Sequence, residues 1–285
     1  MDGYKSVTAF RQKQAAETAK ESPKIADLRP ELPMASYLCL GDRYTHLALK
    51  KEKKPKEFPN TSTKVRVVDG DTFDMAIELA NTDAQTDTKP VCVMSLGSSV
   101  SPGGGFIYGC MAQEEELCYR STLYKTLNVK FYPFRPLEAI YSPSVIIFRE
   151  NWAKKHAMMD LTQPDKLPVM AVVTVAAEMW PRLNTNTTPP TYADEEDREL
   201  MKEKIRVALR VAAHNGHHSL VLGALGCGVF ENPNEEVADC FAEVLQELEF
   251  RGWFSNVVFA VMKDKRQKVR DNYDVFKEKL DGLKC

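Results

Sequence analysis

Residues 102–116 read PGGGFIYGCMAQEEE, so three glycines precede a seven-residue spacer and then Gln113-Glu114-Glu115. Because glycine has no side chain, its backbone can approach a ligand closely and adopt positive φ. We expect a helix over residues 111–127, which places the glutamates in or near its first turn. Free N–H groups and the positive end of the helix dipole attract anions such as phosphate there. Carboxylates beside a phosphate-binding loop indicate hydrolysis of a phosphorylated sugar.

A second glycine-rich stretch, LGALGCGVF, occupies residues 222–230. It directly follows an apolar run at residues 219–222 that predicts a strand, and the first glycine stretch follows another predicted strand at residues 90–96. Ligands of open α/β sheets bind beyond the carboxyl ends of the strands. We therefore expect both glycine loops to face one crevice.

Predicted strands and helices alternate along most of the chain. This alternation indicates an α/β fold with a mostly parallel or mixed sheet covered by helices. Asn232 and Pro233 have the residue types of a helix cap and first turn, so we expect a helix to begin there. The expected strands are 64–68, 90–96, 145–148, 169–175, 219–222 and 256–262, and the other expected helices are 7–20, 35–49, 71–79, 111–127, 193–214 and 271–280.

Composition bounds the class of protein. The chain has 285 residues, 44% of them hydrophobic and 27% charged, which is enough for a sizeable core. A net charge of −2 lacks the basic character of a dedicated nucleic-acid binder. The longest apolar run, residues 169–177, is too short to span a bilayer. We expect a monomer that contacts neither membrane nor nucleic acid.

The cysteines and the N-terminus bear on the cellular compartment. Seven irregularly spaced cysteines do not form a disulfide framework, and we expect Cys92, Cys118 and Cys240 to be small core residues. Residues 1–20 lack the apolar segment of a secretory signal. These features predict a cytoplasmic or nuclear protein that is not secreted.

The spacing Gly-Gly-Gly-x7-Gln-Glu-Glu resembles the hallmark of microbial-type poly(ADP-ribose) glycohydrolases, a branch of the macrodomain superfamily. Residues 222–230 resemble the loop that wraps the diphosphate of ADP-ribose in this family. The resemblance implies a three-layer α/β/α macrodomain-like sandwich with a mixed, mostly parallel sheet. It also implies an N-terminal helical extension, which with a basic linker at residues 50–59 takes up residues 1–60, before a catalytic domain over residues 61–285.

The resemblance implies a glycoside hydrolase that cleaves ribose–ribose O-glycosidic bonds of poly(ADP-ribose) or ADP-ribosylated proteins and releases ADP-ribose, without metal or cofactor. Glu115 would protonate the leaving oxygen, and Glu114 would orient ribose hydroxyls. Consecutive helical residues point about 100° apart, so the two carboxylates cannot act as an opposed acid–nucleophile pair. The implied substrate-binding residues are Gly103, Gly104, Gly105, Gln113, Gly226, Cys227, Gly228, Val229 and Phe230.

One departure concerns the segment before the glycines. Relatives place a ribose-binding asparagine there, whereas residues 95–101 read SLGSSVS. Serine hydroxyls can donate and accept hydrogen bonds, but with a shorter reach. The alternatives are therefore an ADP-ribose reader without turnover, or a hydrolase of a mono-ADP-ribosyl or ADP-ribose phosphate substrate. A simpler alternative for the glutamates is a solvated acidic first turn that stabilises the helix.

Other residues carry weaker signals. His214, His217 and His218 lie across a helix end without a completing cysteine, so we expect histidines of a surface turn rather than metal ligands. Tyr141 or Tyr192 could stack on adenine. Arg182 and Asn184 follow a strand end and either line the cleft or are ordinary loop residues. We expect Cys227 to be a small filler of its loop rather than a nucleophile.

Overall fold

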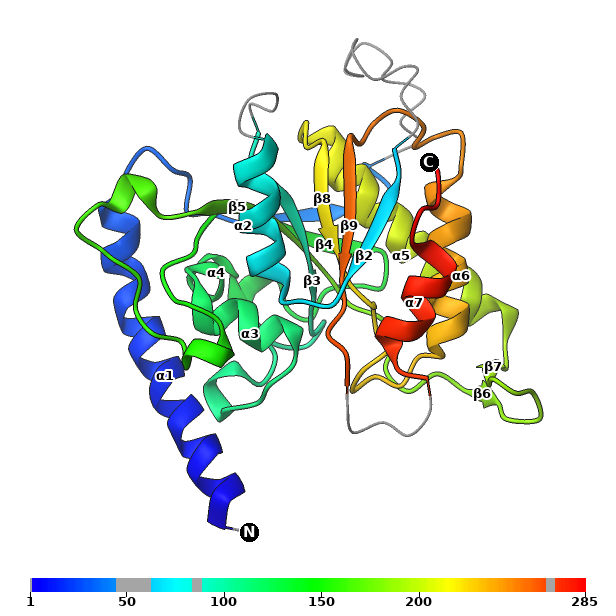
Figure 1. The fold of residues 1–285 in the computed structure, drawn as a ribbon, viewed down its shortest axis with the longest axis horizontal. Coiled ribbons are helices and arrows are strands. Elements are labelled where there is room, and N and C mark those ends of the chain that lie inside the picture. Colours follow the sequence, from blue (N-terminus) through cyan, green and yellow to red (C-terminus); the bar gives the residue numbers. More distant parts are fainter. Residues whose placement is uncertain (1, 45–62, 84–88, 265–269) are drawn as a thin grey trace.

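The computed structural model describes residues 2–44, 63–83, 89–264 and 270–285 (Figure 1). The expected linker at residues 50–59 lies outside these ranges. The elements run α1 Asp2–Asp27, β1 Tyr37–Leu40, β2 Val65–Val68, α2 Thr72–Asp83, β3 Cys92–Leu96, α3 Gln113–Arg120, α4 Leu123–Thr126, β4 Glu138–Ile146, β5 Val169–Val175, β6 Leu183–Asn184, β7 Thr191–Tyr192, α5 Glu195–His214, β8 Ser219–Leu222, α6 Asn234–Leu245, β9 Asn256–Ala260 and α7 Asn272–Leu280.

Seven of the described strands form one mixed sheet in the order β1-β4-β5-β3-β8-β9-β2. The five strands from β5 to β2 are parallel, whereas β1 and β4 run antiparallel to their neighbours. Helices α2, α3 and α4 lie on one side of the sheet and α5, α6 and α7 on the other (Figure 1). The predicted three-layer α/β/α sandwich is confirmed. Among the described residues, no helix is both long and apolar enough to cross a membrane.

Alternation along the central strands divides the core between the two faces. Cys92 and Met94 of β3 belong to the cluster that packs against α5 and α6, whereas Val93 between them packs against α2 and α3. This is the period-two pattern of a strand that is covered on both faces. Both layers of helices are therefore needed to bury β3, the strand that leads into the triple-glycine loop.

Several expected element boundaries are wrong. The segment 37–40, expected to be helical, forms edge strand β1 through pairing with β4, and Pro23 lies inside α1 instead of ending it. The helix expected over residues 111–127 is interrupted after Arg120, where Ser121 adopts extended backbone and bridges Ile147. Each error concerns contacts between segments that are distant in sequence. The division of the chain at residue 60 stays a prediction, although β1 places part of the first segment in the sheet.

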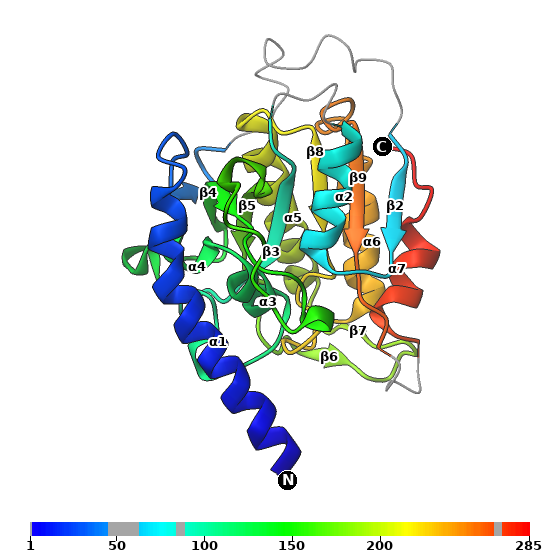
Figure 2. The same cartoon turned by 60° about the vertical axis from the view of Figure 1, so that its left-hand side comes forward.

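Helix α1 packs against the segment that precedes α3 (Figure 2). Arg11 donates to the carbonyl of Gly109 and Gln12 to that of Tyr108, at 3.1 and 3.2 Å. Gly109 has φ of +80°, and a Cβ there would stand 2.7 Å from the carbonyl oxygen of Thr8. Helix α1 therefore buttresses the loop between the three glycines and the glutamates.

A buried arginine fixes α3 against α2. The side chain of Arg120 is fully buried and forms ion pairs with Asp71 and Asp74, the latter at 2.7 Å. Asp71 also accepts hydrogen bonds from the amides of Phe73 and Asp74, so it caps α2. These ion pairs thereby fix α2 and α3, the helices that follow β2 and β3, relative to each other.

Candidate active site

Three parallel strands deliver their following loops to the same edge of the sheet. β3 lies between β5 and β8, so the residues after Leu96, Val175 and Leu222 all emerge at the carboxyl edge. A Cβ at Gly223 would stand 3.2 Å from the Leu96 side chain, so the starting points of the two glycine loops lie close together. The predicted placement of both loops at one edge is confirmed.

The glutamates are not a solvated acidic turn, because Glu114, Glu115 and Glu116 are exposed by only 3, 7 and 8%. Glu116 faces away from the glycine loops and binds the amide of Trp152 and Nε2 of His156. The other two glutamates turn their carboxyl groups toward the loop after β3. The simpler alternative raised by the sequence is therefore wrong.

Glu115 is held by two backbone amides. Its Oε1 accepts a hydrogen bond from Gly105 and its Oε2 one from Ala112, both at 2.8 Å. The second bond completes half of a capping box, since Ala112 is the N-cap of α3 and Glu115 its third residue. Local helix capping and the glycine loop thus fix this carboxyl group from opposite sides.

Glu114 is more deeply buried, and its burial favours the protonated carboxyl group. Its Oε2 accepts from the amide of Ser98 at 2.8 Å, whereas its Oε1 is buried without a hydrogen-bond partner in the described part of the chain. Burial, with a smaller contribution from the charge of Glu115, raises the pKa of Glu114 to about 8. A neutral carboxyl group with an unpaired oxygen can donate to or accept from a ligand hydroxyl.

Gly104 brings the two carboxyl groups together. Its φ is +55°, and a Cβ there would lie 2.6 Å from Oε1 of Glu115 and 3.0 Å from Oε2 of Glu114. Real Cβ atoms do not come this close, so only glycine fits between the two carboxyl groups. The amides of Gly104 and Gly105 are engaged by Ser101 and Glu115. The first loop, expected to offer its amides to phosphate, therefore uses the amide of Gly105 to position Glu115 and that of Gly104 to close its own turn.

Gln113 braces the end of β3. Its Oε1 accepts from the amide of Leu96 at 2.9 Å, and its Nε2 donates to the carbonyl of Met94 at 2.9 Å and to Thr72 at 3.2 Å. All of its polar atoms are thus engaged by the protein itself. Gln113 positions the glutamates relative to the sheet rather than presenting its amide group to a ligand.

The serine segment forms a turn. Ser98 accepts hydrogen bonds at its Oγ from the amides of Val100 and Ser101. Its own amide binds Glu114. The hydroxyl of Ser98 is therefore occupied as an acceptor by the local backbone.

Several backbone amides of the second glycine loop are available to bind a ligand. The N–H groups of Gly226, Gly228, Val229 and Phe230 meet no acceptor among the described residues. Gly226 has φ of +75° and a Cβ there would overlap Ala177, whereas a Cβ at Gly228 would meet nothing within 4 Å. Successive free amides in such a loop form an anion-binding concavity. This loop, rather than the first, has the geometry of a diphosphate cradle.

Asn232 has a different role from the one expected. α6 begins at Asn234, with Pro233 as its N-cap, and no side chain caps it. The amide group of Asn232 instead donates to the carbonyls of Gly226, Glu178 and Phe230 and accepts from the hydroxyl of Tyr192 at 2.9 Å. It holds the second glycine loop against the loop after β5.

The other candidates are accounted for by core contacts. Tyr192 is buried against Asn232, and Tyr141 donates to or accepts from Nε2 of His217 at 2.8 Å, so neither ring is presented to a ligand. His217 is buried rather than on the surface, and its Nδ1 binds the carbonyl of Pro90. Burial raises the pKa of the Cys227 thiol, which disfavours a nucleophilic thiolate.

One exposed aromatic residue at this edge carries no signal in the sequence. Trp180 follows β5 with 62% of its surface exposed, and it donates from both its amide and its indole nitrogen to the second glycine loop. Arg182 lies two positions further on and pairs with Asp194. A tryptophan in a predicted loop carries no mark of exposure, so only the structure could identify it.

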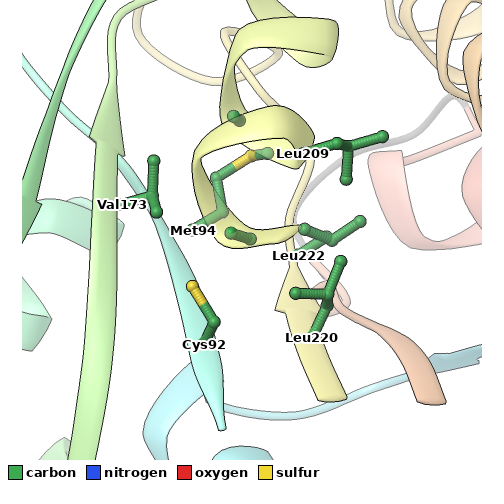
Figure 3. Close-up of a pocket in the computed structure, with 8 residues that line it drawn as sticks. Cys92, Met94, Val173, Leu209, Leu220 and Leu222 are labelled. Carbon is green, nitrogen blue, oxygen red and sulfur yellow. The ribbon is translucent and has the colours of Figure 1, made fainter. Parts of the chain in front are cut away.

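An apolar cavity lies elsewhere, inside the core between the sheet and α5 (Figure 3). Its lining carries no charged or hydroxyl side chain, so it has no means of binding a phosphorylated sugar. The described residues also contain no group of three His, Cys, Asp or Glu side chains able to hold a metal ion. The labelled lining residues are Cys92, Met94, Val173, Leu209, Leu220 and Leu222.

Comparisons with known proteins agree with this geometry. Residues 34–150 match the family model described as microbial-type PARG, catalytic domain, and residues 152–241 match the macro domain. No curated protein matches the chain. The structure of poly(ADP-ribose) glycohydrolase from Thermomonospora curvata is 28% identical, with a TM-score of 0.75 over 94% of this chain and 98% of that chain.

Two structures with bound ligands are also similar. The Thermomonospora curvata enzyme bound to the inhibitor ADP-HPD is 28% identical, with a TM-score of 0.74 over 94% of this chain and 98% of that chain. The Deinococcus radiodurans enzyme in complex with ADP-ribose is 26% identical, with a TM-score of 0.65 over 90% of this chain and 97% of that chain.

Proposed function

We propose that this chain, which belongs to the microbial-type poly(ADP-ribose) glycohydrolases, hydrolyses the ribose–ribose O-glycosidic bond of poly(ADP-ribose) and releases ADP-ribose. One observation carries the assignment of roles within the site. The carboxyl group of Glu115 is fixed by the amides of Gly105 and Ala112, at the edge of the sheet where the second loop presents its free amides. A lone positioned acid beside an anion cradle suits a nucleotide sugar.

Substrate binding divides between the two loops. The amides of Gly226, Gly228 and Val229 hold the diphosphate of the terminal ADP-ribose unit, and Phe230 packs on its reacting ribose. Glu114 contacts the hydroxyls of that ribose through its unpaired Oε1. Because Glu114 is neutral at pH 7, it places no negative charge beside the anionic diphosphate.

The reaction then needs one acid and one water. Glu115 gives its proton to the bridging oxygen, the bond between that oxygen and the anomeric carbon breaks, and the next ribose leaves as an alcohol. The terminal ribose passes through an oxocarbenium-like state. Water adds to the anomeric carbon and returns a proton to Glu115, which restores the enzyme and yields ADP-ribose.

The direct test is release of ADP-ribose from an auto-poly(ADP-ribosyl)ated protein, followed by chromatography of the soluble product. Wild-type protein should shorten the polymer and yield ADP-ribose as the small product. If it binds ADP-ribose in calorimetry but never shortens the polymer, the chain is a reader. The serine-containing segment 95–101 is the feature that favours this second candidate, because it lacks the ribose-binding asparagine.

We also propose that the protein acts inside the cell as a monomer, on ADP-ribosylated proteins and without binding membrane or nucleic acid. Seven free cysteines, one of them exposed Cys110, support a reducing compartment. Fractionation of cells and light scattering of the purified protein test these two statements.

A further inference from the structure

Trp180 is held rigidly although it is exposed. Its backbone N–H donates to the carbonyl of Phe230 and its indole Nε1 to that of Val229, both at 3.0 Å. Its φ is +51°, a left-handed conformation that is costly for a bulky residue and persists only where surrounding contacts enforce it. Both hydrogen-bond donors of Trp180 thus fix its ring to the tip of the second glycine loop.

The ring of Trp180 is not part of the hydrophobic core. Trp180 is 62% exposed, Val229 is 67% exposed and Met179 is 40% exposed, so an apolar patch stands on the surface beside the anion cradle. An indole with its N–H already satisfied offers only its faces. Such a face is a stacking surface for a planar base, and stacking of this kind is largely independent of the identity of the base.

The position of Trp180 along the ligand identifies which base it meets. Gly226 and Gly228 offer amides to the diphosphate, and Phe230 is the residue expected to pack on the reacting ribose. Trp180 lies next to Phe230, because it is bonded to the carbonyl of that residue. The terminal unit's own adenine is at the other end of the diphosphate, whereas the adenosine of the leaving unit is joined directly to the reacting ribose.

A cation follows this aromatic closely in the chain. Arg182 follows Trp180 by two residues, and its side chain is 80% exposed. Only its Nη2 contacts a partner among the described residues, the carboxylate of Asp194 at 3.0 and 2.7 Å. The remaining guanidinium nitrogens can meet an anion without breaking this pair. The leaving unit of the polymer carries a diphosphate as well as an adenine.

We propose that Trp180 and Arg182 form a second nucleotide subsite, which holds the leaving ADP-ribose unit of the polymer. The indole stacks on its adenine and the guanidinium contacts its diphosphate. The inference rests on the proposed function, since only a polymeric substrate has a leaving ADP-ribose unit. The subsite explains how polymer is recognised beyond the terminal unit, without contacts from the first glycine loop.

Binding measurements in a catalytically inactive background test the subsite independently of turnover. In Glu115→Gln protein, adding Trp180→Ala should weaken binding of poly(ADP-ribose) about tenfold, and leave the affinity for monomeric ADP-ribose within about twofold. Trp180→Phe, which keeps an aromatic face but lacks the indole N–H, should retain polymer affinity. Leu248→Ala, which removes another exposed apolar residue, beyond the end of α6, should change neither affinity.

The active enzyme gives a second readout. Trp180→Ala should raise KM for polymer about tenfold with kcat nearly unchanged, and Arg182→Ala should raise KM and reduce its dependence on salt. Unchanged polymer affinity in either variant overturns the subsite. An equal loss of affinity for polymer and for ADP-ribose also overturns it, because that result would assign Trp180 to the terminal unit. A Trp180→Phe variant that binds polymer as weakly as Trp180→Ala overturns it as well. Wild-type protein that binds polymer without cleaving it overturns the proposed hydrolysis and leaves these comparisons intact.

Discussion

The amide nitrogen of Gly105 lies 2.8 Å from Oε1 of Glu115. This hydrogen bond joins the two halves of the motif that is most conspicuous in the sequence, and it gives the three glycines a mechanical role. The loop positions the carboxyl group of Glu115. Gly104, which has no Cβ, fits between the carboxyl oxygens of Glu115 and Glu114. The anion cradle lies instead on the loop after β8.

Glu115→Gln should lower the rate of polymer hydrolysis by about 10²–10⁴-fold, because an amide has no proton to give the leaving oxygen. Glutamine can serve at the third position of a capping box, so we expect the fold and ADP-ribose binding to be kept. Product release and calorimetry measure the two effects. Glu199→Gln, which alters a carboxylate on the outer side of α5, is the control. Activity of Glu115→Gln near the wild-type level would exclude Glu115 as the acid.

Gly104→Ala should reduce hydrolysis at least about a hundredfold, since its Cβ would displace the carboxyl groups of Glu114 and Glu115 and misplacement of about 1 Å has this effect. Gly216→Ala is the matched control. Gly216 has a comparably left-handed φ of +79°, but a Cβ there would meet its nearest atom at 3.7 Å. If Gly216→Ala loses as much activity as Gly104→Ala, the loss would be due to backbone strain alone.

Gly228→Ala should weaken ADP-ribose binding on the order of tenfold, or about 1.4 kcal/mol. A Cβ there meets nothing within 4 Å, so the melting temperature should stay at the wild-type value. The loss of affinity would come from contact with the diphosphate itself. Calorimetry and thermal unfolding separate the two effects. Unchanged affinity would place the diphosphate away from Gly228.

Glu114 should make the protein less stable as the pH rises. Because its pKa is raised to about 8 from an ordinary 4.5, the folded protein binds more protons than the unfolded chain between these values. The free energy of unfolding should therefore fall across this window, by up to about 1.4 kcal/mol per pH unit from this group. Glu114→Gln, which cannot ionise, should show a smaller decrease between pH 5 and 9 in denaturant titrations. Parallel pH profiles for the two proteins would contradict the assignment.

Arg120→Met should lower the free energy of unfolding by about 3–5 kcal/mol, because it leaves Asp71 with a charge that is largely buried and no longer paired. The control is Arg66→Met, which breaks a 3.7 Å pair with Glu78 in which both side chains are more than half exposed. That variant should lose less than about 1 kcal/mol. Equal losses in chemical denaturation would show that the buried network does not brace α3.

The elements predicted best are those whose signals are local. Residues 169–175 and 219–222 form β5 and β8 with the predicted bounds, and Asp71 and Asp271 cap their helices through their own side chains. Contiguous apolar runs and caps need only a few neighbouring residues. The capping-box position of Glu115 is local in the same way. This is why the motif and its helix could be found without the fold.

Segments that depend on distant partners were predicted poorly. Residues 37–40 become a strand because β4 offers an open edge, and Ser121 interrupts a helix because Ile147 pairs with it. Asn232 has the sequence pattern of a helix cap, but the carbonyls of Glu178 and Gly226 take its amide group. In each case a tertiary hydrogen bond overrides the local preference.

The sequence by itself determined which residues are candidates for the chemistry, because glycine spacing, strand ends and the first turn of a helix are defined along the chain. Only the tertiary structure decided the state and the surroundings of those residues. Packing excludes water from Glu114 and so raises its pKa. Ser101 and Glu115 engage the amides of Gly104 and Gly105, whereas those of Gly226 and Gly228 meet no acceptor among the described residues. Trp180 is exposed for the same reason, since solvent contact depends on what packs around a residue and not on its place in the chain.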